Sequence, residues 1–162
     1  MRVIHAPDQS WQYLKDHNIV FLAGSIEMGA AVDWQADVIA RLEAWPDSER
    51  LVVLNPRRPD WDPSWEQDIS NPQFRQQVEW ELDGIEHADL VLMYFDPATK
   101  SPITLLELGF IAGRDQFCTV CCPPGFWRRG NVQIVCARAG GNLVLVDSID
   151  EMIALIFGVC LL

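Results

Sequence analysis

The chain has 162 residues, of which 49% are hydrophobic, so it can bury a sizeable core, and we expect a single domain over residues 1–162. Its formal net charge is −11 with only 12 Lys and Arg residues, which argues against the basic surface that nucleic-acid backbones and anionic membranes bind. We therefore expect no polymeric nucleic acid and no membrane among its partners.

The N-terminus and the cysteines point to a cytoplasmic protein. The first residues contain no apolar signal region, and no run approaches about 18 apolar residues, the length of a membrane span. Five cysteines, an odd number, suit a reducing compartment. Cys118, Cys121 and Cys122 have a spacing that a metal could use, but they lie in an apolar, β-branched segment without a second ligand cluster. We expect buried thiols there rather than zinc, and no metal or cofactor for the protein.

Short apolar runs alternate with amphipathic segments along the chain, a pattern typical of alternating strands and helices. In chain order we expect a strand at 19–24, a helix at 30–45, a strand at 51–54, an ordered loop at 59–68, a helix at 72–88, a strand at 89–95, a helix at 102–112, a strand at 117–122, a loop and helix at 126–139, a strand at 142–146 and a last helix capped at residue 148.

Such alternation predicts an α/β fold with right-handed crossovers, namely a flavodoxin-like or Rossmann-like open parallel sheet of about five strands with helices on both faces. Ligands of these sheets bind beyond the carboxyl ends of the strands. We therefore expect a substrate pocket built from residues that follow the strands and open the next helix. The candidate binding residues there are Gly24, Ser25, Glu27, Asn55, Arg57, Asp96 and Ser101.

Two glutamates occupy inward-facing positions on the predicted helices. We expect the helix at 102–112 to start at Pro102, with the Ser101 hydroxyl as its N-cap acceptor. Glu107 is the only charged residue in that helix and lies within its apolar stripe. Glu81 shares the face of the apolar residues of the helix at 72–88. A buried carboxylate without a partner is unfavourable, so such residues usually have a strong partner or a chemical task.

The motifs in the sequence limit the classes of reaction that we expect of the protein. The glycine patterns of dinucleotide and P-loop sites are missing, and the three histidines show no ligand spacing. Two inward carboxylates suffice to cleave a C1–heteroatom bond, one as nucleophile and one as proton donor. The helix dipole favours the charged form of Glu107, which suits a nucleophile, whereas desolvation favours the protonated form of Glu81, which suits a general acid. Alternatively, each glutamate satisfies a loop amide or an arginine: Arg57, Arg58 or Arg114.

Four segments carry a resemblance to a known family. They are Phe21-Leu-Ala-Gly-Ser-Ile-Glu27, Trp80-Glu-Leu-Asp-Gly-Ile-Glu-His-Ala-Asp-Leu-Val91, Ser101-Pro-Ile-Thr-Leu-Leu-Glu-Leu-Gly109 and Arg129-Gly-Asn-Val132. In this order they resemble the nucleoside 2-deoxyribosyltransferase family and its N-glycosidase relatives. The similarity runs from about residue 19 to residue 146, and the Glu-Leu-Gly segment after an Ala-Asp strand is its most specific part.

The resemblance implies a flavodoxin-like fold and a glutamate, matching Glu107, that attacks C1′ of the sugar to form a glycosyl-enzyme. It implies that Glu81 helps to protonate the departing base, at a position where many relatives carry Asp. Gly24 and Ser25 match the loop that contacts the sugar or its 5′ substituent. Asn131 resembles an asparagine that a neighbouring subunit lends to the 5′-hydroxyl, which implies a homodimer or a higher homo-oligomer with shared active sites.

Several residues have two interpretations. Trp34 and Trp61 suit stacking on a base, but packing in the core or in a loop is an equal alternative. Arg57 and Arg58 suit binding of a 5′-phosphate, but surface ion pairs are an equal alternative.

We expect an enzyme that cleaves the N-glycosidic bond of a nucleoside or deoxynucleoside and passes the sugar to another base. The alternatives are hydrolysis of a nucleoside 5′-monophosphate and a non-catalytic nucleotide-binding or sensor domain, because fold does not fix function. The expected partner is therefore a small-molecule nucleoside or nucleotide.

Overall fold

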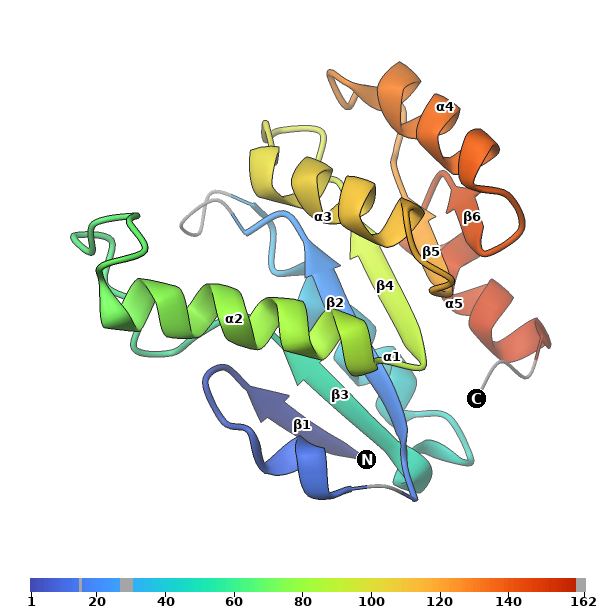
Figure 1. Cartoon of the computed structure of the whole chain (residues 1–162). Helices are drawn as coiled ribbons and strands as arrows, with labels where there is room; N and C mark the ends of the chain where they lie inside the picture. Colours follow the sequence, from blue (N-terminus) through green and yellow to red (C-terminus); the bar gives the residue numbers. More distant parts are fainter. Residues whose placement is uncertain (15, 27–30, 160–162) are drawn as a thin grey trace.

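A single parallel sheet of six strands forms the centre of the computed structural model, which describes residues 1–14, 16–26 and 31–159 (Figure 1). The strands are β1 (Arg2–His5), β2 (Asn18–Gly24), β3 (Leu51–Asn55), β4 (Leu90–Tyr94), β5 (Cys118–Cys121) and β6 (Leu143–Val146). The helices are α1 (Trp34–Glu43), α2 (Pro72–His87), α3 (Pro102–Ala112), α4 (Arg129–Ala139) and α5 (Ile149–Val159), with short 3-10 turns η1 (Ser10–Tyr13) and η3 (Ser48–Arg50).

The strand order is β1-β3-β2-β4-β5-β6, and every neighbouring pair is parallel. The five strands from β2 to β6 have the order of a flavodoxin-like sheet, which confirms the predicted fold class. The sixth strand, β1, was not expected. It is an edge strand of four residues in which only Ile4 is buried, so its sequence lacks the long apolar run of a central strand.

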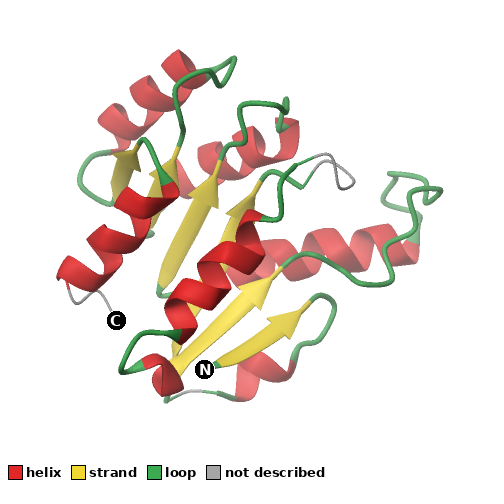
Figure 2. Ribbon diagram, turned by 180° about the vertical axis from the view of Figure 1, so that it is seen from behind, coloured by secondary structure: helices red, strands yellow, loops and turns green. Residues whose placement is uncertain are grey.

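Helices cover both faces of the sheet, as predicted. Figure 1 shows α2, α3 and α4 on the near face, and Figure 2 shows α1 and α5 on the opposite one. Strand residues alternate between the two layers: Phe21 packs in the core beneath α2 and α3, whereas its neighbour Leu22 packs in the core beneath α1 and α5. Because both faces of the strands are covered, the strands read as continuous apolar runs in the sequence.

The cysteines of β5 belong to these two core layers. Cys118 and Cys122 lie in the layer beneath α3 and α4, and Cys121 lies in the other layer. All three are buried, which confirms the expected buried thiols. None of the helices in the described part of the chain combines the length and the apolar character that crossing a bilayer requires.

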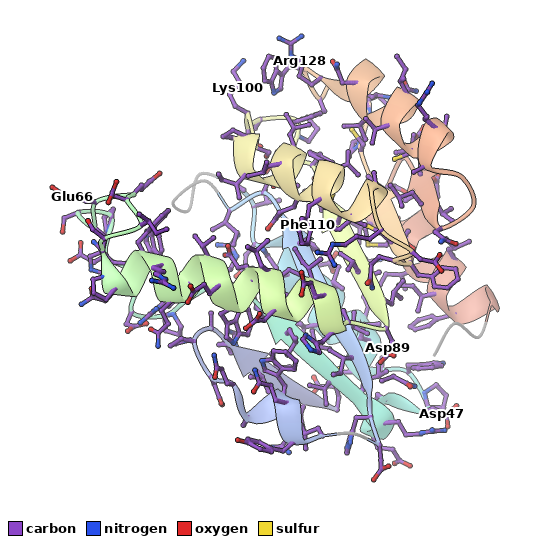
Figure 3. All side chains as sticks on the ribbon, viewed as in Figure 1. Asp47, Glu66, Asp89, Lys100, Phe110 and Arg128 are labelled. Atoms are coloured by element: carbon purple, nitrogen blue, oxygen red, sulfur yellow. The ribbon has the colours of Figure 1, made fainter. Side chains whose placement is uncertain are left out.

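The local signals of α2 explain where this helix begins. Pro72 occupies its first turn, and the Asn71 side chain accepts hydrogen bonds from the backbone amides of Gln73 and Phe74. α2 therefore starts at Pro72. Figure 3 shows its orientation, with Glu66 in the loop before α2 and Asp89 just beyond the opposite end of the helix, where β4 begins.

Candidate active site

A cavity of about 480 Å³ lies where the carboxyl ends of the central strands meet the N-terminal halves of α2 and α3. Its walls come from five parts of the chain: the segments that follow β2 and β3, the loop before α2, and the two helices. The lining residues are Gly24, Ser25, Ile26, Pro56, Arg57, Arg58, Trp61, Gln67, Phe74, Gln77, Val78, Glu81, Ser101, Pro102, Ile103, Thr104 and Glu107. This is the position that the fold predicts for a ligand.

Glu107 lies at the buried end of this cavity, on the second turn of α3, and is only 9% exposed. Burial raises the pKa of Glu107 well above its ordinary value, and the negative charge of Glu81 raises it further. We expected the helix dipole to favour the charged form of Glu107. Desolvation outweighs the dipole here, because the dipole acts mainly within the first turn of a helix.

Glu81 reaches the same cavity from α2 and is half-buried. Burial raises the pKa of Glu81 to about 7, and a hydrogen bond from Gln77 partly opposes this rise. That hydrogen bond runs from Gln77 Nε2 to Glu81 Oε1 at 2.8 Å. Because each carboxylate disfavours the charge of the other, we infer that the pair retains one proton near neutral pH.

The arginines that the sequence offered as alternative partners pair with other carboxylates. Arg57 lies 3.2 Å from Asp33. Arg114 donates to Glu86 at 2.7 Å. Arg58 pairs with Asp60 at 2.8 Å. Among the described residues, none of these three arginines forms an ion pair with either cavity glutamate.

The two arginines in the cavity wall are held in place by further contacts. Arg57 Nε also donates to Gln35 Oε1 at 2.8 Å, and Arg57 Nη2 donates to the Val32 carbonyl at 3.1 Å. Arg58 forms a two-bond contact with Asp60, at 2.8 and 3.2 Å. The Arg58 guanidinium also lies 5.0 Å from the ring centroid of Trp65. Both arginines thus have protein partners for their charge.

Three hydroxyl groups form a buried cluster beside the glutamates, from Ser25, Thr99 and Ser101. The Ser25 and Ser101 hydroxyls are hydrogen-bonded to each other, and Thr99 Oγ1 lies 2.6 Å from Ser101 Oγ. Ser25 Oγ accepts a hydrogen bond from the Asp96 amide at 2.9 Å. The cluster joins the segment after β2 to the start of α3. The participation of Thr99 was not predicted from the sequence.

The start of α3 differs from the prediction at Ser101. Its hydroxyl caps none of the α3 amides but belongs to the hydroxyl cluster. Its backbone is left-handed, with φ 46° and ψ 53°, a conformation that non-glycine residues rarely adopt. The expected side-chain cap is therefore wrong, although Pro102 does occupy the first turn as predicted. Ser101 nevertheless lines the cavity.

Four of the predicted binding residues line the cavity together with the two glutamates: Gly24, Ser25, Arg57 and Ser101. Gly24 permits this arrangement through its backbone. Its φ is +146°, and a Cβ there would lie 2.4 Å from the Tyr94 carbonyl. Trp61, from the loop before α2, also lines the cavity.

Three other predicted binding residues support the loops instead of lining the cavity. Trp34 is 1% exposed and donates from its indole nitrogen to the Ser25 carbonyl at 3.1 Å. Asp96 accepts from the backbone amides of Val32 and Ala98, and Asn55 accepts from the backbone amide of Arg57. Trp34 thus bonds a loop carbonyl, whereas Asp96 and Asn55 bond loop amides, and substrate binding by these three residues stays a prediction. Glu27 lies outside the described residues.

Asn131 lies apart from this cavity. It is exposed on the first turn of α4 and lines a second hollow of about 280 Å³ between α3 and α4. Within one chain, the structure therefore does not bring Asn131 together with the cavity glutamates.

Three cavity residues were not predicted from the sequence, for two different reasons. Gln77 carried no motif, although its position one turn before Glu81 on the same face was a usable signal. Phe74 and Val78 were expected in the core, but they are only partly buried and line the cavity. In the described ranges, no group of three or more His, Cys, Asp or Glu side chains is arranged to hold a metal ion.

Comparisons with known proteins find a matching family model and similar solved structures. A family model described as nucleoside 2-deoxyribosyltransferase like matches residues 17–126. Among solved structures, the crystal structure of a conserved protein from Enterococcus faecalis V583 is similar with a TM-score of 0.58 and 12% identity, covering 88% of this chain and 98% of that chain. At this identity the likeness shows the fold alone. No curated protein matches the sequence.

Proposed function

The chain belongs to the nucleoside 2-deoxyribosyltransferase-like family, whose model covers more than half of it, and we propose that it cleaves the N-glycosidic bond of a nucleoside or deoxynucleoside and transfers the sugar to another base. One observation carries this proposal. Glu107 from α3 and Glu81 from α2 line the same cavity at the carboxyl ends of the sheet and influence each other's ionisation.

The proposed reaction has two displacement steps at C1′. First, a Glu107 carboxylate oxygen bonds to C1′ while the bond from C1′ to the base nitrogen breaks. The departing base keeps that electron pair and takes the proton of Glu81. Second, a nitrogen of the incoming base attacks C1′, the bond to Glu107 breaks, and Glu81 takes up the proton that the incoming base releases. This is the two-carboxylate logic of a retaining glycosidase, with a base in place of water.

The number of protons on the pair suits this scheme. The first step requires exactly one proton shared between the two glutamates, with Glu81 protonated and Glu107 charged. Burial and mutual repulsion favour the singly protonated pair at neutral pH. Burial by itself favours protonated Glu107, so the scheme needs the proton to reside on Glu81 when substrate is bound. A sugar carbon that develops positive charge beside Glu107 would favour this placement by stabilising the Glu107 carboxylate.

The cavity walls fit the two parts of a nucleoside. Trp61, Phe74 and Val78 offer an apolar and aromatic surface on the side of α2, which suits a base. Ser25 and Ser101 offer hydroxyls on the side of α3, which suit the sugar.

The arginine contacts favour an unphosphorylated substrate. Arg57 and Arg58, which would have to bind a 5′-phosphate, already hold Asp33, Gln35 and Asp60. A phosphate bound there would have to share these guanidinium groups with their present partners. We therefore place base transfer from a nucleoside ahead of hydrolysis of a nucleoside 5′-monophosphate.

We also propose that the active site is completed by a second copy of the chain. Ile103 and Leu106 on α3 are 59% and 70% exposed, which is unusual for large apolar residues that lie side by side on one helix. Asn131 lies in the first turn of the neighbouring helix α4. A partner subunit docked on α3 and α4 would cover the apolar residues and could bring its own Asn131 to this cavity.

The decisive experiment incubates the protein with a panel of deoxynucleosides, with and without a second free base, and separates the products by chromatography. A new nucleoside that forms only with the second base supports transfer. Free sugar and base support hydrolysis, and saturable binding without turnover supports a sensor. Glu107→Ala should abolish turnover, whereas Glu79→Ala, which removes an exposed glutamate of α2, should not. Unchanged turnover in Glu107→Ala would contradict the proposed nucleophile.

A further inference from the structure

Gln77 makes an unusual pair of contacts beside the proposed general acid. It lies one turn before Glu81 on α2 and is 5% exposed. Its side-chain nitrogen Nε2 donates to the Pro56 carbonyl at 2.9 Å and to Glu81 Oε1 at 2.8 Å. An amide NH₂ group has two hydrogens, so both are used. Gln77 therefore ties Glu81 to the segment that follows β3.

The Pro56 carbonyl fixes which way the Gln77 amide points. A carbonyl can only accept, so the nitrogen and not the oxygen of the amide must face it. The Gln77 oxygen, Oε1, is then left buried, with no partner among the described residues. A buried acceptor without a partner is unfavourable, so the arrangement retains an energetic cost while keeping Nε2 on Glu81.

We propose that Gln77 is a positioning residue that occupies Oε1 of Glu81 and leaves Oε2 as the oxygen that gives and recovers the proton. This inference rests on the proposed function, in which Glu81 is the general acid. A fixed carboxyl group presents its proton in one direction, which is the positional requirement for proton transfer to a bound base. Once the proton has left, the Nε2–H bond stabilises the remaining carboxylate.

The groups around Glu81 act in opposite directions on its ionisation. Glu107 faces it from α3 and disfavours the carboxylate. From the segment after β3, Arg57 and Arg58 line the same cavity but are paired with Asp33 and Asp60. From its own helix, Gln77 favours the carboxylate. Loss of the Gln77 amide should therefore raise the pKa of Glu81, and no other described contact to Glu81 would oppose the rise.

The first test measures this ionisation directly and needs no enzymatic activity. Carbon-13 NMR of glutamate-labelled protein, with the Glu81 signal identified by its loss in Glu81→Gln, gives the titration midpoint of Glu81. In Gln77→Met we expect the midpoint to rise by about one pH unit, the size of a charge-assisted hydrogen bond. Gln73→Met, an exposed glutamine on the same helix, is the matched control and should leave the midpoint unchanged.

An unchanged midpoint in folded Gln77→Met protein would overturn the proposal, because Gln77 would then only brace α2 against β3. Gln77→Leu serves as the second variant if the Met variant does not fold. This outcome is independent of the proposed function, since it is read without substrate.

The second test applies once transfer is established. Gln77→Met should lower kcat about tenfold or more, with KM within about twofold, because the proton donor is misplaced while the binding surface remains. The alkaline limb of the pH–rate profile should move to higher pH by the same amount as the NMR midpoint. A limb that stays in place while the midpoint moves would overturn the assignment of Gln77 to proton delivery.

Discussion

Several single residues of the cavity adopt states that are unfavourable for folding. Glu107 is a buried carboxyl without an ion-pair partner in the described chain, and Ser101 has a left-handed backbone. Gln77 keeps a buried oxygen without a hydrogen bond. Local rules of protein stability are most often broken where function requires it. Their concentration in one cavity supports the view that this cavity, rather than the second hollow, is the active site.

The buried carboxyls should make stability fall as the pH rises. The pKa of both glutamates is higher in the folded chain than in the unfolded one, so the folded state binds more protons. Their contribution is fully present below the unfolded pKa of about 4.5 and is lost as the pH rises through the raised folded-state pKa of each glutamate, which is about 7 for Glu81. Glu107→Gln, which removes the charge, should stabilise the protein at pH 8 by about 1–3 kcal/mol and have little effect at pH 4.

Thermal unfolding of the wild type and Glu107→Gln across this pH range provides the measurement. The control is Glu79→Gln, an exposed glutamate that should have the same small effect at both pH values. Equal stability of Glu107→Gln and the wild type at pH 8 would show that Glu107 is not desolvated in the folded chain.

Residue positions were predicted well where they depend on helical periodicity, and side-chain directions were predicted poorly where they depend on loop geometry. Glu107 and Glu81 were assigned to inner faces from the spacing of their apolar neighbours, and both line the cavity. Asn55 and Asp96 were correctly placed at strand ends, but their side chains satisfy loop amides. The direction of a side chain in a loop depends on hydrogen bonds between distant segments. Position along the chain alone does not determine that direction.

Among the elements, the junction of β2 and β4 is the most constrained point of the site. Gly24 lies opposite Tyr94 in the sheet, with φ +146°. A Cβ at Gly24 would lie 2.4 Å from the Tyr94 carbonyl and 2.9 Å from the Trp34 ring. The following residue, Ser25, belongs to the hydroxyl cluster. A glycine is therefore required both by the backbone and by the space around it.

Gly24→Ala should destabilise the protein by about 2–4 kcal/mol, because the strand pair must separate and the backbone must adopt a strained conformation. For a chain of this size this corresponds to a fall in Tm of about 5–15 °C. Differential scanning calorimetry measures it. Gly130→Ala is the matched control, because a Cβ there meets no atom within 4 Å. Similar Tm values for the two variants would contradict the close approach of β2 and β4 at Gly24.

Most helices and strands were predicted from the sequence. Strand β1 was not, and there is a physical reason for this. The strands from β2 to β5 are mostly buried, so burial imposes apolar runs that the sequence displays. β6, at the other edge of the sheet, is only partly buried, but its Leu-Val-Leu-Val sequence is also apolar. β1 is a short edge strand that gains its backbone partners only from β3. Edge pairing of this kind requires no apolar run, and so no local pattern predicts it.

At the scale of the whole molecule, α3 packs on the sheet with one side and exposes large apolar residues on another. It is apolar on nearly all sides, with Leu108 in the core and Leu106 70% exposed. The starts of α3 and α4 meet at the Trp127 ring. Lys100, which precedes α3, lies 4.5 Å from the ring centroid, and the guanidinium of Arg128, which precedes α4, lies 4.3 Å from it. Figure 3 labels both cations. This surface is the proposed contact with a second copy.

Shared active sites predict complementation between two defective variants. Glu107→Ala should lack the nucleophile, and Asn131→Ala should lack the residue that each chain lends to its partner. In a two-fold symmetric dimer, a mixed dimer has one cavity that combines intact Glu107 of one chain with intact Asn131 of the other. Mixed dimers purified through two different tags after co-expression should therefore show about half of wild-type activity, measured as base exchange, because one of their two cavities is complete.

The control pairs Glu107→Ala with Glu81→Ala. Both residues line the cavity of their own chain, so every cavity in that mixture lacks one carboxyl and activity should stay absent. Recovery in the first mixture but not in the second would locate the subunit boundary between Asn131 and the two glutamates. Absence of recovery in the first mixture, with mixed dimers present, would contradict a shared site even if the protein is a dimer. In that case the whole reaction would take place in a cavity formed by one chain.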